Sequence, residues 1–381
     1  MLRRREFLRA AGVLTAARSR AQPRKPNLLL LVASGFRSTT LDPDLRLPHL
    51  SRLTQEGARF ERLYVSCPAA GPSQASLITG RFPFACGVLK DGDSLPADLP
   101  TIATQLQAAG YQTALAGDWR LGAPAGHGFA SRLRDAHDAE SFMKNSAPWF
   151  LMVCLEGRTR AAQSMSTPLR ANVPEELESG ARNQLANYAA FCSAIDASVG
   201  SLLAALDQKR IASDTLVAFT STHGSMLGSQ GLDGADVAYE ESVRVPLILR
   251  YPGRLEPGSQ HGSLASNVDL APTLLALCGA PPAQMAQGRD LMSGQAESIY
   301  SVGQLGSPGE WRMVVRGADK LVVDREQNVT HLFNLAQDPF EVDNRAQDPA
   351  QDLKRDELKA LLKDWMRRTG DGMDPSGLRR R

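Results

Sequence analysis

The feature that most constrains the fold is a short, uninterrupted run of aliphatic residues near the start of the chain. It extends from Leu28 to Val32, directly after Pro26 and Asn27. A strand with one wetted face alternates apolar and polar residues, whereas a strand covered on both faces reads as a continuous apolar run. The run therefore predicts a central strand in a sheet that has helices on both sides.

Segments with strand and helix patterns alternate along most of the chain. The further predicted strands are 60–65, 111–116, 149–155, 215–220 and 245–250. The predicted helices are 47–57, which ends at a glycine, 72–79, 101–109 and 188–206. Such alternation favours a mostly parallel sheet sandwiched by helices. We expect the polar stretches 124–147 and 157–176 to be loops near the mouth of this sheet.

The pattern changes after about residue 305. Short strand-like segments follow at 312–316, 321–324 and 331–335, and an amphipathic helix pattern covers 354–367. We therefore predict an α/β domain over 26–304, followed by a small antiparallel subdomain with one helix over 305–369. We expect the polar tail 370–381 to be disordered.

Residues 1–21 have the features of an export signal. Arg4-Arg5-Glu6-Phe7-Leu8 precedes a weakly apolar stretch, and Ser19 and Ala21 are small residues at the spacing of a signal-peptidase site. The pattern predicts a twin-arginine signal peptide and a periplasmic or extracellular protein. We find no later stretch with the roughly 18–20 apolar residues of a membrane span, so no transmembrane segment is predicted.

Charge and cysteine content exclude several function classes. The formal net charge of the 381 residues is only +2, so we expect no nucleic acid as partner. The five cysteines include no CxxC pair and no zinc-like spacing. We interpret most of them as small buried hydrophobic residues, and at least one must lack an intramolecular disulfide partner because their number is odd.

One motif resembles the signature of the sulfatases, members of the alkaline-phosphatase-like superfamily. That signature reads Cys or Ser, any residue, Pro, Ser, Arg, two residues, Leu, any residue, Thr-Gly-Arg. Pro72, Ser73, Leu77 and the run 79–81 match it. In the family the nucleophile is a cysteine that is oxidised to formylglycine, and this chain has Ala70 at that position. The arginine that supports the nucleophile is replaced by Gln74. An alanine methyl group is no nucleophile.

The resemblance covers about residues 26–368, because further family-like runs follow in the family's order. They are 47–60, 109–122, 219–232, 239–247, 269–274 and 332–344. The resemblance implies the α/β alkaline-phosphatase-like/sulfatase fold. It has a large mostly parallel sheet sandwiched by helices and a small C-terminal subdomain of antiparallel sheet plus helix.

The resemblance also assigns positions to the family's calcium ligands and anion-binding groups, and these positions are changed. Ser34, Gly35, Thr222 and His223 occupy the places of the metal ligands, without a carboxylate. Asp118 stands at the position of a family lysine, and Arg120 stands at the position of a family histidine. Gln230 stands at the position of a second family histidine. A carboxylate at 118 repels an anionic ester, although Arg120 can partly offset it by pairing with Asp118. We therefore expect neither calcium nor formylglycine as cofactor.

The most direct interpretation is a sulfatase-like protein, related to sulfuric ester hydrolases but catalytically inactive, whose cleft binds a sulfated glycan or a protein partner. The residues predicted to line this cleft are Ser34, Gly35, Arg37, Ala70, Ser73, Gln74, Asp118, Arg120, Thr222, His223 and Gln230. The alternative is an active sulfatase or phosphoesterase-type hydrolase with a rebuilt site. Ser34, Thr222 and His223 are the residues from which a serine–histidine pair can be assembled, although the chain has no Gly-x-Ser-x-Gly motif.

Overall fold

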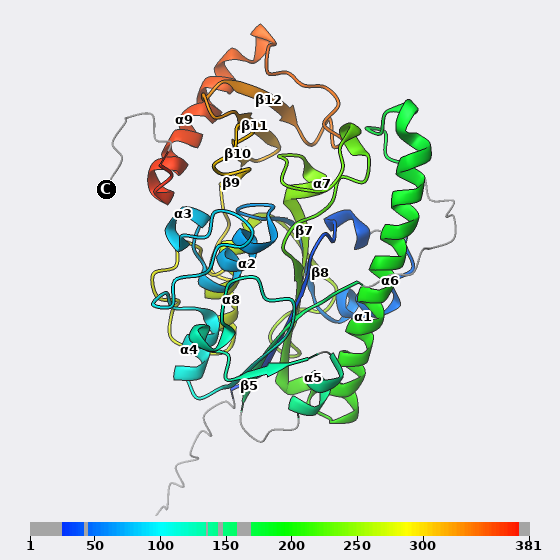
Figure 1. Ribbon diagram of the computed structural model, residues 1–381, viewed down its shortest axis with the longest axis vertical. Helices are drawn as coiled ribbons and strands as arrows, with labels where there is room; N and C mark the ends of the chain where they lie inside the picture. Colours follow the sequence, from blue (N-terminus) through cyan, green and yellow to red (C-terminus); the bar gives the residue numbers. More distant parts are fainter. Residues whose placement is uncertain (1–24, 42–44, 135, 144–147, 158–168, 373–381) are drawn as a thin grey trace, which may run out of the picture.

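The computed structural model describes residues 25–41, 45–134, 136–143, 148–157 and 169–372 (Figure 1). The predicted signal peptide and most of the predicted tail lie outside these residues. Within them the chain forms one large sheet and one small sheet. The helices are α1 (Pro48–Glu56), α2 (Ala70–Thr79), α3 (Pro83–Cys86), α4 (Ile102–Ala108), α5 (Ala136–Phe142), α6 (Glu178–Gln208), α7 (Glu240–Val243), α8 (Leu270–Leu277) and α9 (Asp352–Thr369).

The large sheet has the strand order β4-β3-β5-β1-β6-β7-β2-β8. Its strands are β1 (Asn27–Ala33), β2 (Ala58–Tyr64), β3 (Gln112–Gly117), β4 (Ser131–Leu133), β5 (Trp149–Cys154), β6 (Thr215–Ser221), β7 (Arg244–Arg250) and β8 (Ser259–Ser266). Neighbouring strands are parallel except where β7 pairs with β6 and with β2. This confirms the predicted mostly parallel sheet.

Helices cover both faces of the large sheet, as the apolar run in β1 predicts. Leu28 and Leu30 join the hydrophobic cluster under α2, α4 and α8, whereas Leu29 and Leu31 join the one under α1, α5 and α6. All four side chains are fully buried. Alternate residues of β1 thus contribute to two different cores, which explains why the strand contains no polar residue inside the sheet.

The small sheet is antiparallel, with the order β12-β11-β10-β9. Its strands are β9 (Ser298–Gly303), β10 (Trp311–Arg316), β11 (Asp319–Val323) and β12 (Val329–Asn334). Helix α9 packs on this sheet through Leu358, Leu362 and Met366. Sheet and helix form one end of the molecule (Figure 1). The predicted C-terminal subdomain of antiparallel sheet and helix is therefore present.

Two predicted boundaries of this subdomain need correction. Its first strand is β9, which pairs with β10 along its whole length, so the sheet starts before the predicted boundary at 305. The predicted disordered tail was wrong at its start, because Asp371 is only 3% exposed. Its carboxylate accepts hydrogen bonds from Arg312 and Tyr300, both fully buried. An ionised side chain is buried in this way only when it is paired.

Two other predictions from the sequence were incomplete. The stretch 124–147, expected to be loop, contains the edge strand β4 and helix α5. Helix α6 starts at Glu178, ten residues before its predicted start, because its first turns are too polar to show the apolar pattern. The region Glu175–Gln208 is long and apolar enough to cross a membrane by length and composition, which the sequence analysis did not anticipate. However, 56% of its most apolar window is buried inside the protein, as in a core helix.

Candidate functional site

The centre of the candidate site lies where β1 and β6 end side by side. Because the two strands are neighbours and parallel, the residues that follow them meet at one edge of the sheet. Ser34 follows β1, and Thr222 and His223 follow β6. The Thr222 hydroxyl donates to Ser34 Oγ at 3.0 Å, and Ser34 Oγ lies 3.1 Å from Nε2 of His223. The fold thus joins three of the predicted site residues in one hydrogen-bonded cluster.

The imidazole of His223 is held in one tautomer by its surroundings. Its Nδ1 lies 2.7 Å from the carbonyl oxygen of Gly224. A carbonyl oxygen only accepts hydrogen bonds, so Nδ1 carries the proton and Nε2 is the acceptor that faces Ser34. Burial lowers the pKa of His223 from its usual value, because the imidazolium would lose water contacts. Asp91 and Arg120 act on the same ring with opposite signs.

This cluster does not fit the calcium that the family resemblance implies. Calcium takes six to eight oxygen ligands, as a rule with carboxylates among them. Ser34, Gly35, Thr222 and His223 provide two hydroxyl groups and one imidazole, and these three groups are already bonded to one another. Within the described ranges no group of three His, Cys, Asp or Glu residues is arranged to hold a metal ion. We derive no metal chemistry from this site.

A carboxylate occupies the start of α2, where the family signature places the nucleophile. Ala70 is the first residue of α2 and is 5% exposed. The next amide, Gly71 N–H, donates to Asp91 Oδ1 at 2.6 Å. A helix N-terminus attracts anions through its free amides and its dipole. In this chain one of these amides is used by the protein's own carboxylate.

The segment after β3 brings further charge to the same edge. Arg120 Nη2 lies 2.7 Å from Asp118 Oδ2, which confirms the pairing considered from the sequence, and Arg120 Nη1 lies 4.0 Å from Asp91 Oδ2. Gln74 links this segment to α2, since its amide donates to Asp118 O at 3.2 Å and accepts from Arg120 N at 3.0 Å. Asp91, Asp118 and Arg120 therefore form a charged group beside α2, and Asp91 connects it to the start of the helix.

Three residues predicted to line the cleft have other roles. Ser73 is fully buried and its hydroxyl accepts from Asn267 at 3.0 Å. Gln230 donates to the backbone oxygens of Phe340 and Glu341, and so ties the large domain to the C-terminal subdomain. The guanidinium of Arg37 donates to backbone oxygens of the segment 225–226. Ser73 and Gln230 thus support the fold, and Arg37 lines a separate cavity.

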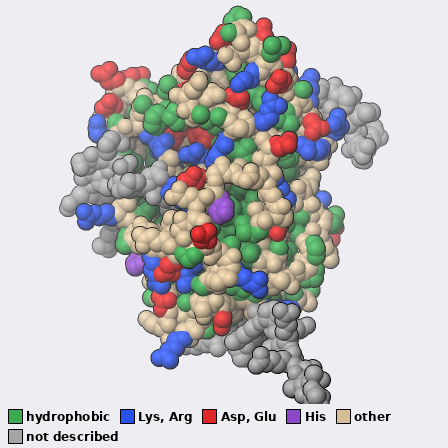
Figure 2. Space-filling view, turned by 180° about the vertical axis from the view of Figure 1, so that it is seen from behind, with side chains coloured by type: hydrophobic (Ala, Val, Ile, Leu, Met, Phe, Trp, Pro, Cys, Tyr) green, Lys and Arg blue, Asp and Glu red, His purple; other side chains and the backbone are tan. Residues whose placement is uncertain are grey.

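That cavity has a volume of about 510 Å³ and is lined by arginine and glutamate side chains together. Arg37, Arg170 and Arg244 contribute positive charge, and Glu240 and Glu241 contribute negative charge. Burial, followed by the nearby charge of Arg170, lowers the pKa of Arg37 to about 10. Figure 2 shows basic and acidic side chains side by side on the face of the molecule seen there. The cavity can accept a ligand that has both anionic groups and hydroxyl donors.

One carboxylate oxygen in this cavity lacks a hydrogen-bond donor. Glu241 Oε1 accepts from Asn172 at 2.9 Å and lies 3.5 Å from Arg170 Nη1. Glu241 Oε2 is buried and has no hydrogen-bond partner among the described residues. Buried polar atoms are normally paired, so such an atom is a position at which a ligand donor or a water molecule is expected.

Two acidic residues at or near the site, Asp91 and Asp236, carry no signal in the sequence that marks them. Asp91 belongs to the short turn-forming run 90–93, which carries no spacing signal for a site. Asp236 accepts from Gln304 N at 3.0 Å, and burial, reinforced by the charge of Asp91, raises its pKa to about 6. Only the folded chain brings these two carboxylates near each other.

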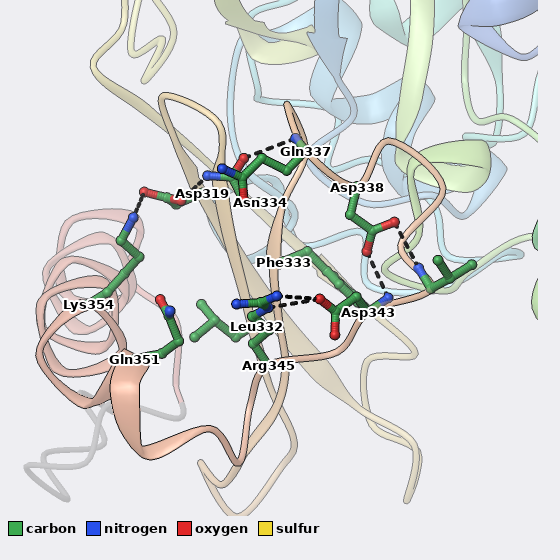
Figure 3. Close-up of a pocket in the computed structure, with 11 residues that line it drawn as sticks. Asp319, Leu332, Phe333, Asn334, Gln337, Asp338, Asp343, Arg345, Gln351 and Lys354 are labelled. Atoms are coloured by element: carbon green, nitrogen blue, oxygen red, sulfur yellow. Dashed lines mark hydrogen bonds and ion pairs between the residues drawn. The ribbon is translucent and has the colours of Figure 1, made fainter.

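A second cavity of about 510 Å³ lies in the C-terminal subdomain (Figure 3). The charged groups drawn there have partners within the drawn set, and Asp338 accepts from the backbone amides of residues 342 and 343. Asp319 accepts from Asn334 at 2.8 Å and from Lys354 at 2.7 Å, and Arg345 lies 2.7 Å from Asp343. These partners satisfy each other, and no residue that lines this cavity is among the described residues with an unpartnered buried polar atom, so we do not assign it as the functional site.

A scan against family models matches the sulfatase model over residues 26–148 and 136–280. The chain is 24% identical over 422 residues to an ulvan-active sulfatase of Formosa agariphila, covering 92% of this chain and 83% of that protein. It is 29% identical over 352 residues to arylsulfatase A of Homo sapiens, covering 73% and 69% of the two chains.

Solved structures support the fold assignment. A protein in complex with its substrate D-glucosamine-2-N,6-O-disulfate superimposes with a TM-score of 0.83 and 20% identity, over 91% of this chain and 99% of that chain. The phosphonate monoester hydrolase of Agrobacterium radiobacter superimposes with a TM-score of 0.76 and 19% identity, over 90% and 96%. At these identities the likeness concerns the fold alone, which is the predicted alkaline-phosphatase-like/sulfatase fold.

Proposed function

Because this chain belongs to the sulfatase family, we propose that it retains the scaffold and the cleft of a hydrolase but does not hydrolyse sulfate esters. The observation that supports this most directly is the start of α2. Ala70 stands at the nucleophile position, and the adjacent Gly71 amide is bonded to Asp91. A methyl group can attack no sulfur atom, and the carboxylate occupies an amide that an incoming anion would need.

The charges around Ala70 support the same proposal. Two unit charges about 4 Å apart interact by about 4 kcal/mol at an effective dielectric constant near 20. Replacing a lysine by Asp118 therefore changes an attraction of this order into a repulsion. Asp118 is 44% exposed and paired with Arg120, so solvent and pairing reduce the effect. A net loss of about 3 kcal/mol of transition-state stabilisation would still slow a reaction by roughly a hundredfold.

We further propose that the chain binds a sulfated glycan through the arginine-lined cavity around Arg37, Arg170 and Arg244. Arg37 already donates to backbone oxygens and Arg244 lies 3.5 Å from Glu240, so Arg170 is the cation that we expect to meet a sulfate oxygen. A hydroxyl of the sugar would supply the donor that Glu241 Oε2 lacks among the described residues. Two relatives support this ligand class by name, the ulvan-active sulfatase and an N-acetylglucosamine-6-O-sulfatase of Bacteroides thetaiotaomicron. A protein partner remains the alternative prediction.

Calorimetric titration with a sulfated glucosamine disaccharide and with its desulfated counterpart tests the binding proposal. We expect the sulfated sugar to bind at least tenfold more tightly, since a hydrogen bond to a charged group contributes about 1.5–3 kcal/mol. Arg170→Gln should weaken its binding about tenfold or more. Arg182→Gln is the matched control, because Arg182 is an exposed residue of α6 paired with Glu178. Equal affinity for both sugars, or no binding of either, would contradict the proposal.

We also propose that the protein is exported by the twin-arginine route, on the basis of residues 1–21 alone. Replacing Arg4 and Arg5 by lysine should leave the full chain in the cytoplasm of a bacterial host that has this export system. Fractionation followed by immunoblotting measures the distribution. Export that is unaffected by the double replacement would contradict this assignment.

A further inference from the structure

The hydrogen bonds around Ser34 are those of a serine whose hydroxyl is polarised by a base. Ser34 Oγ lies 3.1 Å from Nε2 of His223, and the proton on Nδ1 is fixed by the carbonyl oxygen of Gly224 at 2.7 Å. Nε2 is therefore a free acceptor, and the Ser34 hydroxyl is the donor to it. Nucleophile, base and an oriented second ring nitrogen are the three parts of a serine–histidine pair.

The backbone holds this pair rigidly. Ser34 directly follows β1, and the chain then turns at Gly35, whose φ of +89° is a conformation that side-chain-bearing residues rarely adopt. Gly35 N–H donates to His223 O at 3.1 Å, and the Ser221 hydroxyl donates to the same oxygen at 2.7 Å. Serine and histidine are thus fixed at the ends of two bonded strands, which limits the loss of geometry by loop motion.

The space beside the imidazole is open at Gly35. A Cβ atom placed on Gly35 would meet only His223 Cε1, at 3.9 Å. Ser34, Gly35 and His223 are each half-buried, not enclosed by the core. The Ser34 hydroxyl is therefore not sealed off from the space beside Gly35.

We propose that Ser34 is a catalytic nucleophile, activated by His223, that accepts an acyl group from a carboxylic ester. Ser34 Oγ forms a bond to the carbonyl carbon while its proton moves to Nε2 of His223. The tetrahedral intermediate then expels the alcohol, which leaves with the proton from Nε2. Water hydrolyses the acyl-serine by the same steps in reverse order, and the carboxylic acid is released.

The charges at the site favour this substrate class over sulfate or phosphate esters. Asp91 and Asp118 repel an anionic ester, whereas an ester with an uncharged acyl group is not repelled. Asp91 and Arg120 act on the His223 ring with opposite signs, so neither charge alone decides the field at Ser34. The activity is separate from sulfate ester hydrolysis and does not depend on the proposed glycan binding.

Covalent labelling tests the proposal without knowledge of the natural ester. The mature protein is incubated with diisopropyl fluorophosphate, the adduct is measured by intact-mass spectrometry, and the labelled residue is located by peptide mapping. In this reaction Ser34 Oγ bonds to phosphorus and fluoride leaves. We expect one adduct, on Ser34. His223→Gln should slow labelling at least a hundredfold, the usual contribution of a general base being about 10²–10⁴.

Ser201→Ala is the matched control, because Ser201 is an exposed residue of α6 whose hydroxyl donates to the Ala197 carbonyl. It should label at the wild-type rate. In parallel, the wild-type protein should release phenol from an aryl acetate and Ser34→Ala should not. Absence of an adduct on Ser34 of the folded wild-type protein would overturn the proposal, whether or not the variants fold. So would equal labelling rates for wild type and His223→Gln. Neither result would affect the proposal on sulfate esters.

Discussion

The end of the chain offers a quantitative test of the structure, because Asp371 forms a buried ion pair with Arg312. Both side chains are fully buried. Arg312 Nε donates to Asp371 Oδ2 at 2.7 Å, and Arg312 Nη2 donates to Asp371 Oδ1 at 2.9 Å. Tyr300 donates a third hydrogen bond to Asp371, at 2.5 Å. Breaking a buried ion pair by removing one partner costs about 3–5 kcal/mol, because the other charge stays in the core. Since Glu310 still lies 2.7 Å from Arg312, we expect Asp371→Asn to fall at the lower end of this range.

The loss of unfolding free energy can be expressed as a decrease in the melting temperature Tm. Unfolding entropy is about 2.1 cal/mol/K per residue, hence about 0.8 kcal/mol/K for this chain, so a loss of 3–5 kcal/mol lowers Tm by about 4–6 °C. Circular dichroism melts of Asp371→Asn and of a chain ending at residue 369 should both show this decrease. A chain ending at residue 372 keeps Asp371 and is the matched control, with an unchanged Tm. If the 369 and 372 truncations melt within 1 °C of each other, the assignment of Asp371 to the core is wrong.

Three further predictions concern buried groups. Lys320→Met removes the buried cation that lies 3.1 Å from Glu240 and 2.6 Å from Glu341, and leaves only Arg244, at 3.5 Å, beside Glu240. It should lower the unfolding free energy in urea by about 3–5 kcal/mol, and no loss would contradict the pairing. Asp236→Asn should remove a decline in stability as pH rises from about 4 to about 6. The folded state binds this proton more tightly, with a pKa of about 6, than the unfolded state does. A decline of equal size in the wild type and the variant, in urea titrations over that range, would exclude Asp236 as its source. Gly224→Ala would place a Cβ 1.9 Å from a backbone oxygen and should lower Tm strongly, whereas Gly126→Ala, with open space around it, should not.

The sequence predicted the central sheet well because its signals are local. A run of five aliphatic residues at 28–32 has one simple explanation, a strand covered on both faces. Apolar patterning did not predict the start of α6, because the exposed first turns of this helix show no apolar stripe. It also failed for β9, which looks like any short apolar segment until its pairing with β10 is known.

The candidate site was predictable only where the family resemblance assigned positions. Ser34, Thr222 and His223 follow strands that the alternation pattern makes neighbours, so their proximity could be expected. Asp91 and Asp236 could not be found, because neither belongs to a motif and their positions depend on tertiary contacts. Arg37 and Gln230 were assigned to the cleft by position, but a side chain's direction depends on packing that the sequence does not reveal.

The central claim is that the site around Ala70 does not hydrolyse sulfate esters. The most direct measurement is the release of phenol from an aryl sulfate and from an aryl phosphate by the mature protein, with and without calcium. The companion variant carries Ala70→Cys and Gln74→Arg and is produced together with a formylglycine-generating enzyme. We predict no turnover above background for either protein, because Asp91, Asp118 and the carboxylate-free strand ends remain. Sulfate release by the unmodified protein would contradict the account, and release by the variant alone would restrict the loss to the nucleophile.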